Sequence, residues 1–271
     1  MQDKRTSLRE AIATIPDGAV LALGGNTIHR GPGAAVHEIV RQRKSGLKIV
    51  KTAGAYDIDL LCATGCAAVV SAGYVGYESV LGLAPSYRRA VETGLVRADE
   101  HACYTVIAGL RATIQGVPFM PVAGLTGSDL PDARGFQWVS DPYSGEQVVA
   151  IPPIAPDVAI VHVHEADRFG NAVIHGTRFE DVLMVQAAKR VILTAERVVD
   201  GAGFAEHPDT TTISSLYVTD VVEAPGGAWP FGCAGLYEPD LAFLQEFVAA
   251  SAGEDAIAAF VAERLLEAAP A

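Results

Sequence analysis

The N-terminal part of the chain combines one helical pattern with one strand pattern. Ser7 and Glu10 have the spacing of a capping box, and apolar residues then recur at helical intervals until Pro16. The continuous apolar run AVLALGG that follows is typical of a strand buried on both faces. A loop over Gly24–Gly33 and a helix over residues 33–43 are expected next.

The same alternation repeats along the rest of the chain. Further helices are predicted near residues 57–63, 84–93, 103–115, 178–190, 238–250 and 254–267. Strands are predicted in LKIVKTA, AAVVSAG, residues 119–122, QVVAIPPI, DVAIVHVHEAD, RVILTAE and SLYVTDVVEAP. Helices that alternate with short apolar strands favour an α/β fold, with an open, mostly parallel sheet covered by helices on both faces.

Residues 123–146 interrupt this pattern. They are rich in Gly, Asp, Pro and Ser, and we expect a long irregular excursion that is functional or faces a partner. The strand pattern resumes at residue 147, so no domain boundary is placed in the loop. We therefore predict one domain over residues 1–271.

Composition narrows the cellular setting and the partners. Half of the residues are hydrophobic and 19% are charged, so part of the apolar surface is expected to lie under another chain. The net charge of −12 argues against binding nucleic acid or an anionic membrane. The N-terminus has no apolar signal core, and no apolar run approaches the ~20 residues of a membrane span. We expect a soluble cytoplasmic protein with reduced cysteines.

The loop after the first strand is the leading candidate site. In open α/β sheets, ligands bind where strands end, and glycines there allow the backbone to approach an anion or a carbonyl oxygen closely. Gly24, Gly25 and Asn26 begin this loop, and Arg30 could bind a carboxylate with both arms of its guanidinium. The alternative is a tight turn with a surface arginine. The GxGxxG spacing of dinucleotide sites is absent.

Two other groups of polar residues lie in a predicted strand or directly after one. His162 and His164 share one face of a strand and could bind a metal, but no third ligand stands at a suitable spacing, so no metal site is predicted. They are expected instead to be hydrogen-bonded histidines at a subunit contact or a strand end. Gly170 and Asn171 form a turn pair, and Asn171 can reach a substrate or brace a neighbouring loop.

Two carboxylates near strand ends complete the list of candidates. Glu78 lies in GYESVLG and Glu100 in RADEHACY. Each can equally be a helix-capping acid or an ion-pair partner.

Five blocks of the chain, taken in order, give it a resemblance to a known family. They are GGNTIHRGP, SAGYVGYESVLGLAPSYRRAVETG, ADEHACYTVIAGLRATIQGVPFMPV, ADRFGNAVIHG and VEAPGGAWP. Over nearly its whole length the chain resembles the A subunits of class I CoA-transferases, especially the glutaconate CoA-transferase branch. The resemblance implies the CoA-transferase fold and a heteromeric, cytoplasmic enzyme of acyl-CoA metabolism.

The resemblance also implies roles for the two chains. In this family the catalytic glutamate lies in the B subunit, so the B chain is an obligatory partner in an A2B2 or larger assembly. Here Gly24, Gly25 and Asn26 would line the acyl pocket, and glycine N–H groups could stabilise the thioester oxygen. Arg30 would lie near the acid end of the substrate. The CoA thioester, of a dicarboxylic or oxo acid, would be a substrate and not a tightly bound cofactor.

Two alternatives stay open. The family includes steroid-ring-opening hydrolases in which a glutamate of the A chain, in the stretch matching ADEHACY, acts on the substrate. That makes Glu100 the catalytic candidate of this chain. The second alternative is a small-molecule-binding protein that has kept the fold and lost the chemistry.

Overall fold

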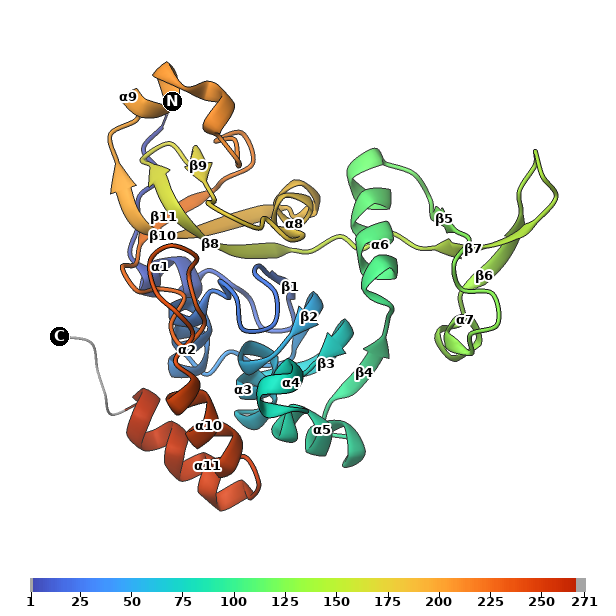
Figure 1. Cartoon of the computed structure of the whole chain (residues 1–271), viewed down its shortest axis with the longest axis horizontal. Helices are drawn as coiled ribbons and strands as arrows, with labels where there is room; N and C mark the ends of the chain where they lie inside the picture. Colours follow the sequence, from blue (N-terminus) through green and yellow to red (C-terminus); the bar gives the residue numbers. More distant parts are fainter. Residues whose placement is uncertain (1, 267–271) are drawn as a thin grey trace.

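A computed structural model describes residues 2–266, and its core is a twisted parallel sheet (Figure 1). Seven strands lie in the order β11-β10-β8-β1-β2-β3-β4, and all neighbouring pairs are parallel. The strands are β1 (Val20–Leu23), β2 (Leu47–Gly54), β3 (Ala67–Val75), β4 (Arg97–Glu100), β8 (Val158–Asp167), β10 (Arg190–Val199) and β11 (Asp220–Glu223). The short β9 (Ala172–Val173) pairs antiparallel with β8.

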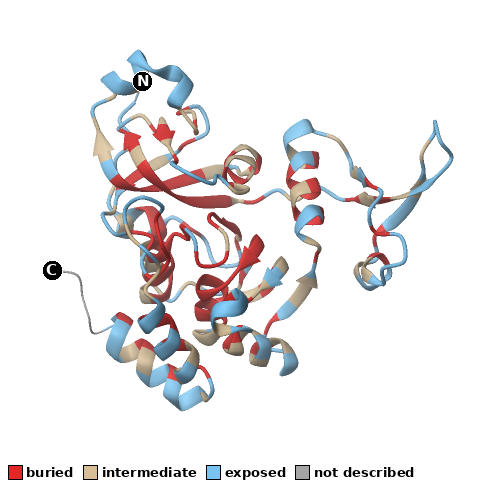
Figure 2. Cartoon of the chain, viewed as in Figure 1, coloured by how far each residue is buried: buried red, intermediate tan, exposed pale blue. Residues whose placement is uncertain are grey.

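Helices cover both faces of this sheet, as expected. One layer contains α1 (Leu8–Ala13), α2 (Gly33–Arg41), α3 (Tyr56–Ala63), α4 (Glu78–Leu81), α5 (Pro85–Glu92), α10 (Leu241–Ala250) and α11 (Glu254–Val261). The other layer contains α6 (Cys103–Gln115) and α8 (Asp181–Ala187), which pack against each other. The central strands are buried between the layers, as their continuous apolar sequences require (Figure 2).

A separate arm projects from this body (Figure 1). It is a three-stranded antiparallel sheet in the order β5-β7-β6, formed by β5 (Met120–Val122), β7 (Gln147–Ile151) and β6 (Gln137–Ser140). A short helix, α7 (Leu130–Arg134), precedes β6. The arm has its own small core, in which Phe136 and Val149 are buried.

The arm corrects two predictions. Residues 123–146 are not wholly irregular, because they contain α7 and β6. The strand pattern at residue 147 does not continue the main sheet, because β5 and β7 pair with each other in the arm. The apolar pattern located these strands correctly, but such a pattern does not specify which sheet a strand joins.

The remaining elements agree with the predictions in part. The capping box at Ser7 is present, and α6 has the predicted bounds. In the predicted strand SLYVTDVVEAP only Asp220–Glu223 is a strand. The helix α9 (Ala202–Glu206) and the element at Pro208–Thr210 were not predicted. The helix predicted over 254–267 is α11 followed by a π-helical turn at Ala262–Leu266, and residue 267 lies outside the described residues.

The strand order places a switch point beside β1. From β1 the chain builds β2, β3 and β4 on one side, and then returns to place β8, β10 and β11 on the other. Open α/β sheets bind ligands outside the carboxyl ends of strands at such a point. Within residues 2–266, no helix has both the length and the apolar character needed to cross a membrane.

Candidate functional site

The glycine loop leaves β1 at the switch point, and its backbone is held from both sides. The Gly25 N–H donates to Asp181 Oδ1 at 2.8 Å, and the Gly24 N–H donates to the carbonyl of Ile160 at 2.9 Å. A Cβ on Gly24 would lie 2.3 Å from Asp181 Oδ1, so only glycine fits this approach. Both amides therefore already donate within the chain, and the predicted contact of glycine N–H groups with a thioester oxygen stays a prediction.

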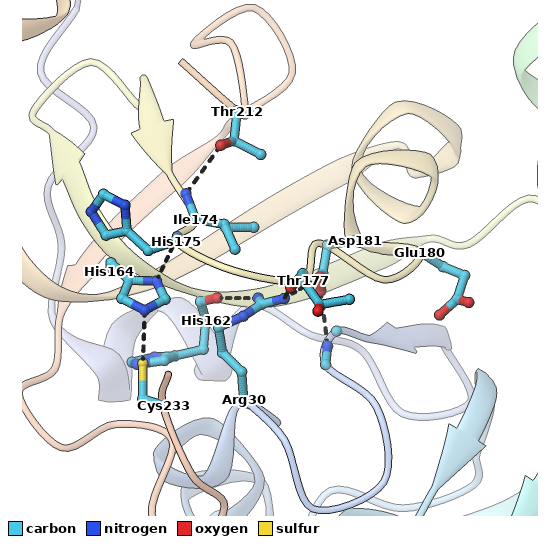
Figure 3. Close-up of polar contacts among 12 residues, drawn as sticks. Arg30, His162, His164, Ile174, His175, Thr177, Glu180, Asp181, Thr212 and Cys233 are labelled. Atoms are coloured by element: carbon cyan, nitrogen blue, oxygen red, sulfur yellow. Dashed lines mark hydrogen bonds and ion pairs between the residues drawn. The ribbon is translucent and has the colours of Figure 1, made fainter. Parts of the chain in front are cut away.

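Arg30 and Asp181 form a buried ion pair beneath this loop (Figure 3). Arg30 Nη2 lies 2.5 Å from Asp181 Oδ2, and the two side chains are 3% and 0% exposed. The guanidinium also donates to the carbonyls of His162 and Thr177, at 2.8 and 3.1 Å. The backbone of Arg30 has a positive φ of 51°, and its side chain is buried. Arg30 is therefore not the surface arginine of the alternative. Its guanidinium is already occupied by Asp181 and two carbonyls, so it is not free to bind a substrate carboxylate.

A second buried ion pair supports the loop from β2. Lys51 Nζ lies 2.5 Å from Asp57 Oδ2 and donates to the carbonyl of Gly24 at 2.8 Å. Both side chains are fully buried. A buried charge is tolerated when it is paired and hydrogen-bonded, and breaking such a pair is costly. Both pairs therefore fix where the glycine loop lies relative to the strand ends.

Two glutamates lie beside the loop, and each is held by a threonine hydroxyl. Thr27 Oγ1 donates to Glu78 Oε1 at 2.8 Å, and Thr52 Oγ1 donates to Glu180 Oε2 at 2.6 Å. The Thr27 N–H donates to the carbonyl of Ala53, which joins the loop to the end of β2. Glu78 is exposed, and its φ of 56° is unusual for a residue other than glycine. The structure thus brings Glu78 to the loop that begins with Gly24, Gly25 and Asn26.

Behind the loop, His162 belongs to a buried hydrogen-bond network centred on Glu196. His162 Nε2 lies 2.8 Å from Glu196 Oε1, and the Gly226 N–H donates to Oε2 at 2.7 Å. The Tyr237 hydroxyl also donates to Oε1. Burial raises the pKa of Glu196, but the hydrogen bonds from His162, Tyr237 and Gly226 outweigh it and lower the pKa to about 2. Burial lowers the pKa of His162, so a neutral imidazole donates to the carboxylate.

The same network contains a group of three potential metal-ligand residues. Ligand atoms of His162, Glu196 and Cys233 lie within 4.8 Å of one another. His164 Nε2 lies 3.5 Å from Cys233 Sγ and 2.9 Å from the carbonyl of Ala234 (Figure 3). The Glu196 carboxylate already accepts three hydrogen bonds, so a metal would have to displace them. These donors fit a hydrogen-bond network better than a metal site.

Glu100 lies at the same edge of the sheet but farther from the loop. It ends β4, and three strand spacings of about 4.8 Å place that strand roughly 14 Å from β1. Its neighbour Asp99 pairs with Arg97 and Arg134, each at 3.0 Å. Glu100 is exposed and has no ion-pair partner within the described residues, so it is the freer of the two acids.

Gly170 and Asn171 lie apart from this group. They follow Asp167, which stands seven residues beyond the position on β8 that pairs with β1, or roughly 23 Å along the strand. Asn171 Nδ2 donates to Asp167 Oδ2 at 2.7 Å, and Asn171 Oδ1 accepts from the Ser215 N–H. Asn171 lines a separate cavity of about 1180 Å³ together with Arg168, Phe204 and Tyr217. Here Asn171 braces the 212–217 loop.

Sequence reasoning missed the residues that hold the site together. Asp181, Glu180 and Thr52 were not singled out, and neither was Glu196. Asp181 and Glu180 contact residues 128 to 156 positions away, so no local spacing reveals them. The one available signal was a pair of acids at the start of a predicted helix, after a turn containing Gly176.

Comparison with known proteins identifies the family to which this arrangement belongs. The model of the coenzyme A transferase family matches residues 5–224, which is most of the chain. The chain belongs to the coenzyme A transferase family. The sheet order and the glycine loop described above are therefore those of a CoA-transferase chain, and the resemblance predicted from the five sequence blocks is confirmed.

Named relatives of this CoA-transferase chain are A subunits. It is 32% identical to the A subunit of glutaconate CoA-transferase from Acidaminococcus fermentans, over 96% of this chain and 87% of the relative. It is 35% identical to the A subunit of 3-oxoadipate CoA-transferase from Pseudomonas knackmussii, over 88% and 85%. It is also 32% identical to the cholesterol ring-cleaving hydrolase IpdA subunit of Mycobacterium tuberculosis, over 93% and 89%. A protein of Archaeoglobus fulgidus is 37% identical over 94% of this chain, which spans 58% of that protein.

Solved structures confirm the predicted fold. The glutaconate CoA-transferase of Acidaminococcus fermentans superimposes with a TM-score of 0.93 at 31% identity, covering 97% of this chain and 89% of that one. The decarboxylase AibA/AibB superimposes with a TM-score of 0.87 at 34% identity, covering 97% and 100%. The prediction of an enzyme chain of CoA-transferase type is confirmed at the level of the family.

Proposed function

We propose that this chain is the A half of a heteromeric CoA-transferase. The complex exchanges CoA between an acyl-CoA thioester and a second carboxylic acid, and the B subunit supplies the catalytic glutamate. The family match, together with relatives that are named as A subunits, supports this proposal. The acyl group is that of an oxo acid or a dicarboxylic acid, and the CoA thioester is a substrate and not a bound cofactor.

The observation that carries the proposal is the buried clamp under the glycine loop. Asp181 holds the Gly25 amide and the Arg30 guanidinium together, and Lys51 holds the Gly24 carbonyl. This clamp fixes the position of the glycine loop at the switch point of the sheet, where the loop would form one wall of an acyl pocket shared with the B chain. A rigid wall suits a reaction in which a thioester must meet a nucleophile in one orientation, because misplacement by about 1 Å can cost ~100-fold in rate.

The proposed division of labour follows from the chemistry. The carboxylate of the B chain attacks the thioester carbonyl and CoA leaves, which turns one hard exchange into several easier steps. This chain orients the acyl group against that carboxylate. The whole chain, residues 1–271, acts as one domain in a cytoplasmic A2B2 or larger assembly. Of the predicted substrate-binding residues, Gly24, Gly25, Asn26 and Glu78 lie at this wall.

A specific observation favours one second candidate, hydrolysis of a large, ring-derived acyl-CoA. Glu100 is exposed at the same edge as the glycine loop, roughly 14 Å away, which an extended ring system could span. The likeness to the ring-cleaving hydrolase supports this reading of Glu100 as catalytic. A binding protein without catalysis is the third candidate, and it would need no B chain.

One experiment separates these candidates. The complex of this chain with its B partner is incubated with an acyl-CoA and acetate, and the products are resolved by liquid chromatography and mass spectrometry. Formation of acetyl-CoA supports transfer. Release of free acid or a ring-opened product without acetyl-CoA supports hydrolysis, and release of CO₂ contradicts both. A lone chain that is stable and binds CoA thioesters tightly contradicts the proposed need for a B partner.

A further inference from the structure

Glu180 lies beside the candidate site but belongs to neither of the two buried ion pairs, Arg30–Asp181 and Lys51–Asp57. It directly precedes Asp181, yet the two carboxylates point to different places (Figure 3). Asp181 is fully buried under the glycine loop, whereas Glu180 reaches the end of β2 and accepts a hydrogen bond from the buried Thr52 hydroxyl at 2.6 Å. Glu180 is only partly buried, and this hydrogen bond involves one of its two carboxylate oxygens.

The Glu180 carboxylate lies among the strand ends that form the site. The Cys103 thiol donates to the Thr52 carbonyl at 3.4 Å, and a Cβ on Gly73 would lie 2.3 Å from the Cys103 nitrogen. Partial desolvation raises the pKa of the exposed Cys103 thiol, and the negative charge of Glu180 raises it further. Glu180 therefore lies close to the ends of both β2 and β3.

The charges around this position are not balanced on this chain. The two cations next to the glycine loop, Arg30 and Lys51, are each neutralised by a buried acid. In contrast, Glu78 and Glu180 have no ion-pair partner within residues 2–266, and their contacts are threonine hydroxyls. Within the described residues, the two carboxylates beside the loop therefore have no cation at ion-pair distance, whereas both buried cations are already paired.

We propose that Glu180 is a specificity-determining residue of the acyl pocket, whose charge selects against acyl groups that carry a distal carboxylate on this side. The inference rests on the proposed function and deepens it. Like charges in a partly dehydrated site repel each other strongly, while a ketone or hydroxyl group meets no such repulsion. Of the two substrate classes proposed above, Glu180 favours oxo acids over dicarboxylic acids.

The test uses two acyl-CoA substrates of similar size, one with a charged end and one with a neutral end. Glutaryl-CoA ends in a carboxylate, and 5-oxohexanoyl-CoA carries a methyl ketone in the same place. The quantity measured is the ratio of their kcat/KM values in transfer to acetate by the complex with the B chain. Glu180→Gln removes the charge but can still accept the Thr52 hydroxyl hydrogen, so the fold should be retained. Glu92→Gln, on the outer surface of α5, is the matched control.

Wild-type complex should prefer 5-oxohexanoyl-CoA, and E180Q should shift the ratio toward glutaryl-CoA by about tenfold. The wild-type preference should weaken at high salt, whereas the ratio of E180Q should depend little on salt, because salt screens only the charge. E92Q should behave like wild type. A ratio that changes less than twofold in E180Q would overturn the inference.

Affinity measurements distinguish failure of the inference about Glu180 from failure of the proposed function. If the complex transfers CoA with neither substrate, the proposed function fails. The affinities of the two acyl-CoAs for wild type and E180Q, measured by calorimetry, then still test the inference. An E180Q complex that binds glutaryl-CoA no better relative to its ketone analogue contradicts the role of Glu180 independently of turnover.

Discussion

At the scale of single residues, Asp181 connects the parts of the site. One carboxylate oxygen accepts from Gly25, and the other pairs with Arg30, both inside the protein. Gly24, Gly25 and Arg30 were foreseen, because a glycine pair at the end of an apolar strand is a local pattern. Asp181 and Glu196 were not, because their partners lie 151 and 34 positions away and only folding brings them together.

Asp181→Ala should destabilise the protein by about 3–5 kcal/mol, because it leaves the Arg30 charge buried without a partner. The double variant Arg30→Met with Asp181→Leu should recover much of this loss, since apolar residues of similar size can replace a buried pair. Thermal unfolding of the purified complex measures both. The double variant should still transfer CoA poorly, because the Gly25 amide has lost its acceptor. Normal turnover in the double variant would show that the clamp does not position the loop.

The low pKa of Glu196 in the folded protein predicts that the free energy of unfolding depends on pH. Its pKa falls from 4.5 to about 2 on folding, so the folded state favours the ionised form. The stabilisation is complete above pH 4.5 and is lost as the pH falls toward 2, by about 3 kcal/mol in all. Urea unfolding between pH 2 and 7 measures this slope. Glu196→Gln should be less stable at pH 7 and should show a shallower loss below pH 4.5; an unchanged slope would contradict the role of this carboxylate.

At the scale of elements, the predictable parts were those with local signals. The capping box located α1, and helical periodicity gave the bounds of α6. The strand β4 has the sequence RADE, which carries no apolar pattern, and its pairing with β3 appears only in the folded sheet. The arm strands β5 and β7 were found but assigned to the wrong sheet, because pairing is a tertiary property.

One pair of glycine variants can test whether the close approach of Gly24 to Asp181 is needed for activity. Gly24→Ala places a methyl group against Asp181 Oδ1 and should reduce kcat/KM by about 100-fold by displacing the loop. Gly18→Ala is the control, since Gly18 has a φ of 76° and no atom within 4 Å of the added Cβ. It should lose about 1–2 kcal/mol of stability and keep its kcat/KM. Equal activities of the two variants would contradict the importance of this close approach.

At the scale of the whole molecule, the arm exposes apolar side chains that its own core does not use. Trp138 in β6 is 39% exposed, and Tyr143 between β6 and β7 is 98% exposed. Both strands belong to the projecting arm (Figure 1). Large aromatic side chains are enriched in protein interfaces. The expectation that residues 123–146 face a partner remains a prediction. An irregular composition indicated the segment, but nothing in one sequence specifies the surface that covers it.

Replacing Trp138 and Tyr143 together by serine should weaken assembly without unfolding the chain. Neither side chain belongs to the buried core of the arm around Phe136 and Val149. Sedimentation velocity of the co-expressed chains measures the size of the assembly, and circular dichroism checks the fold. A variant that assembles at the same concentration as wild type would exclude these two residues from the interface.

In the proposed enzyme, the carboxylate that attacks the thioester belongs to the B chain, while this chain shapes the opposite wall. To test this, the complex is quenched during turnover, and the peptides of both chains are searched for a glutamyl-CoA thioester by mass spectrometry. We expect the adduct on one glutamate of the B chain and none on this chain. An adduct on Glu180, Glu78 or Glu100 would contradict it.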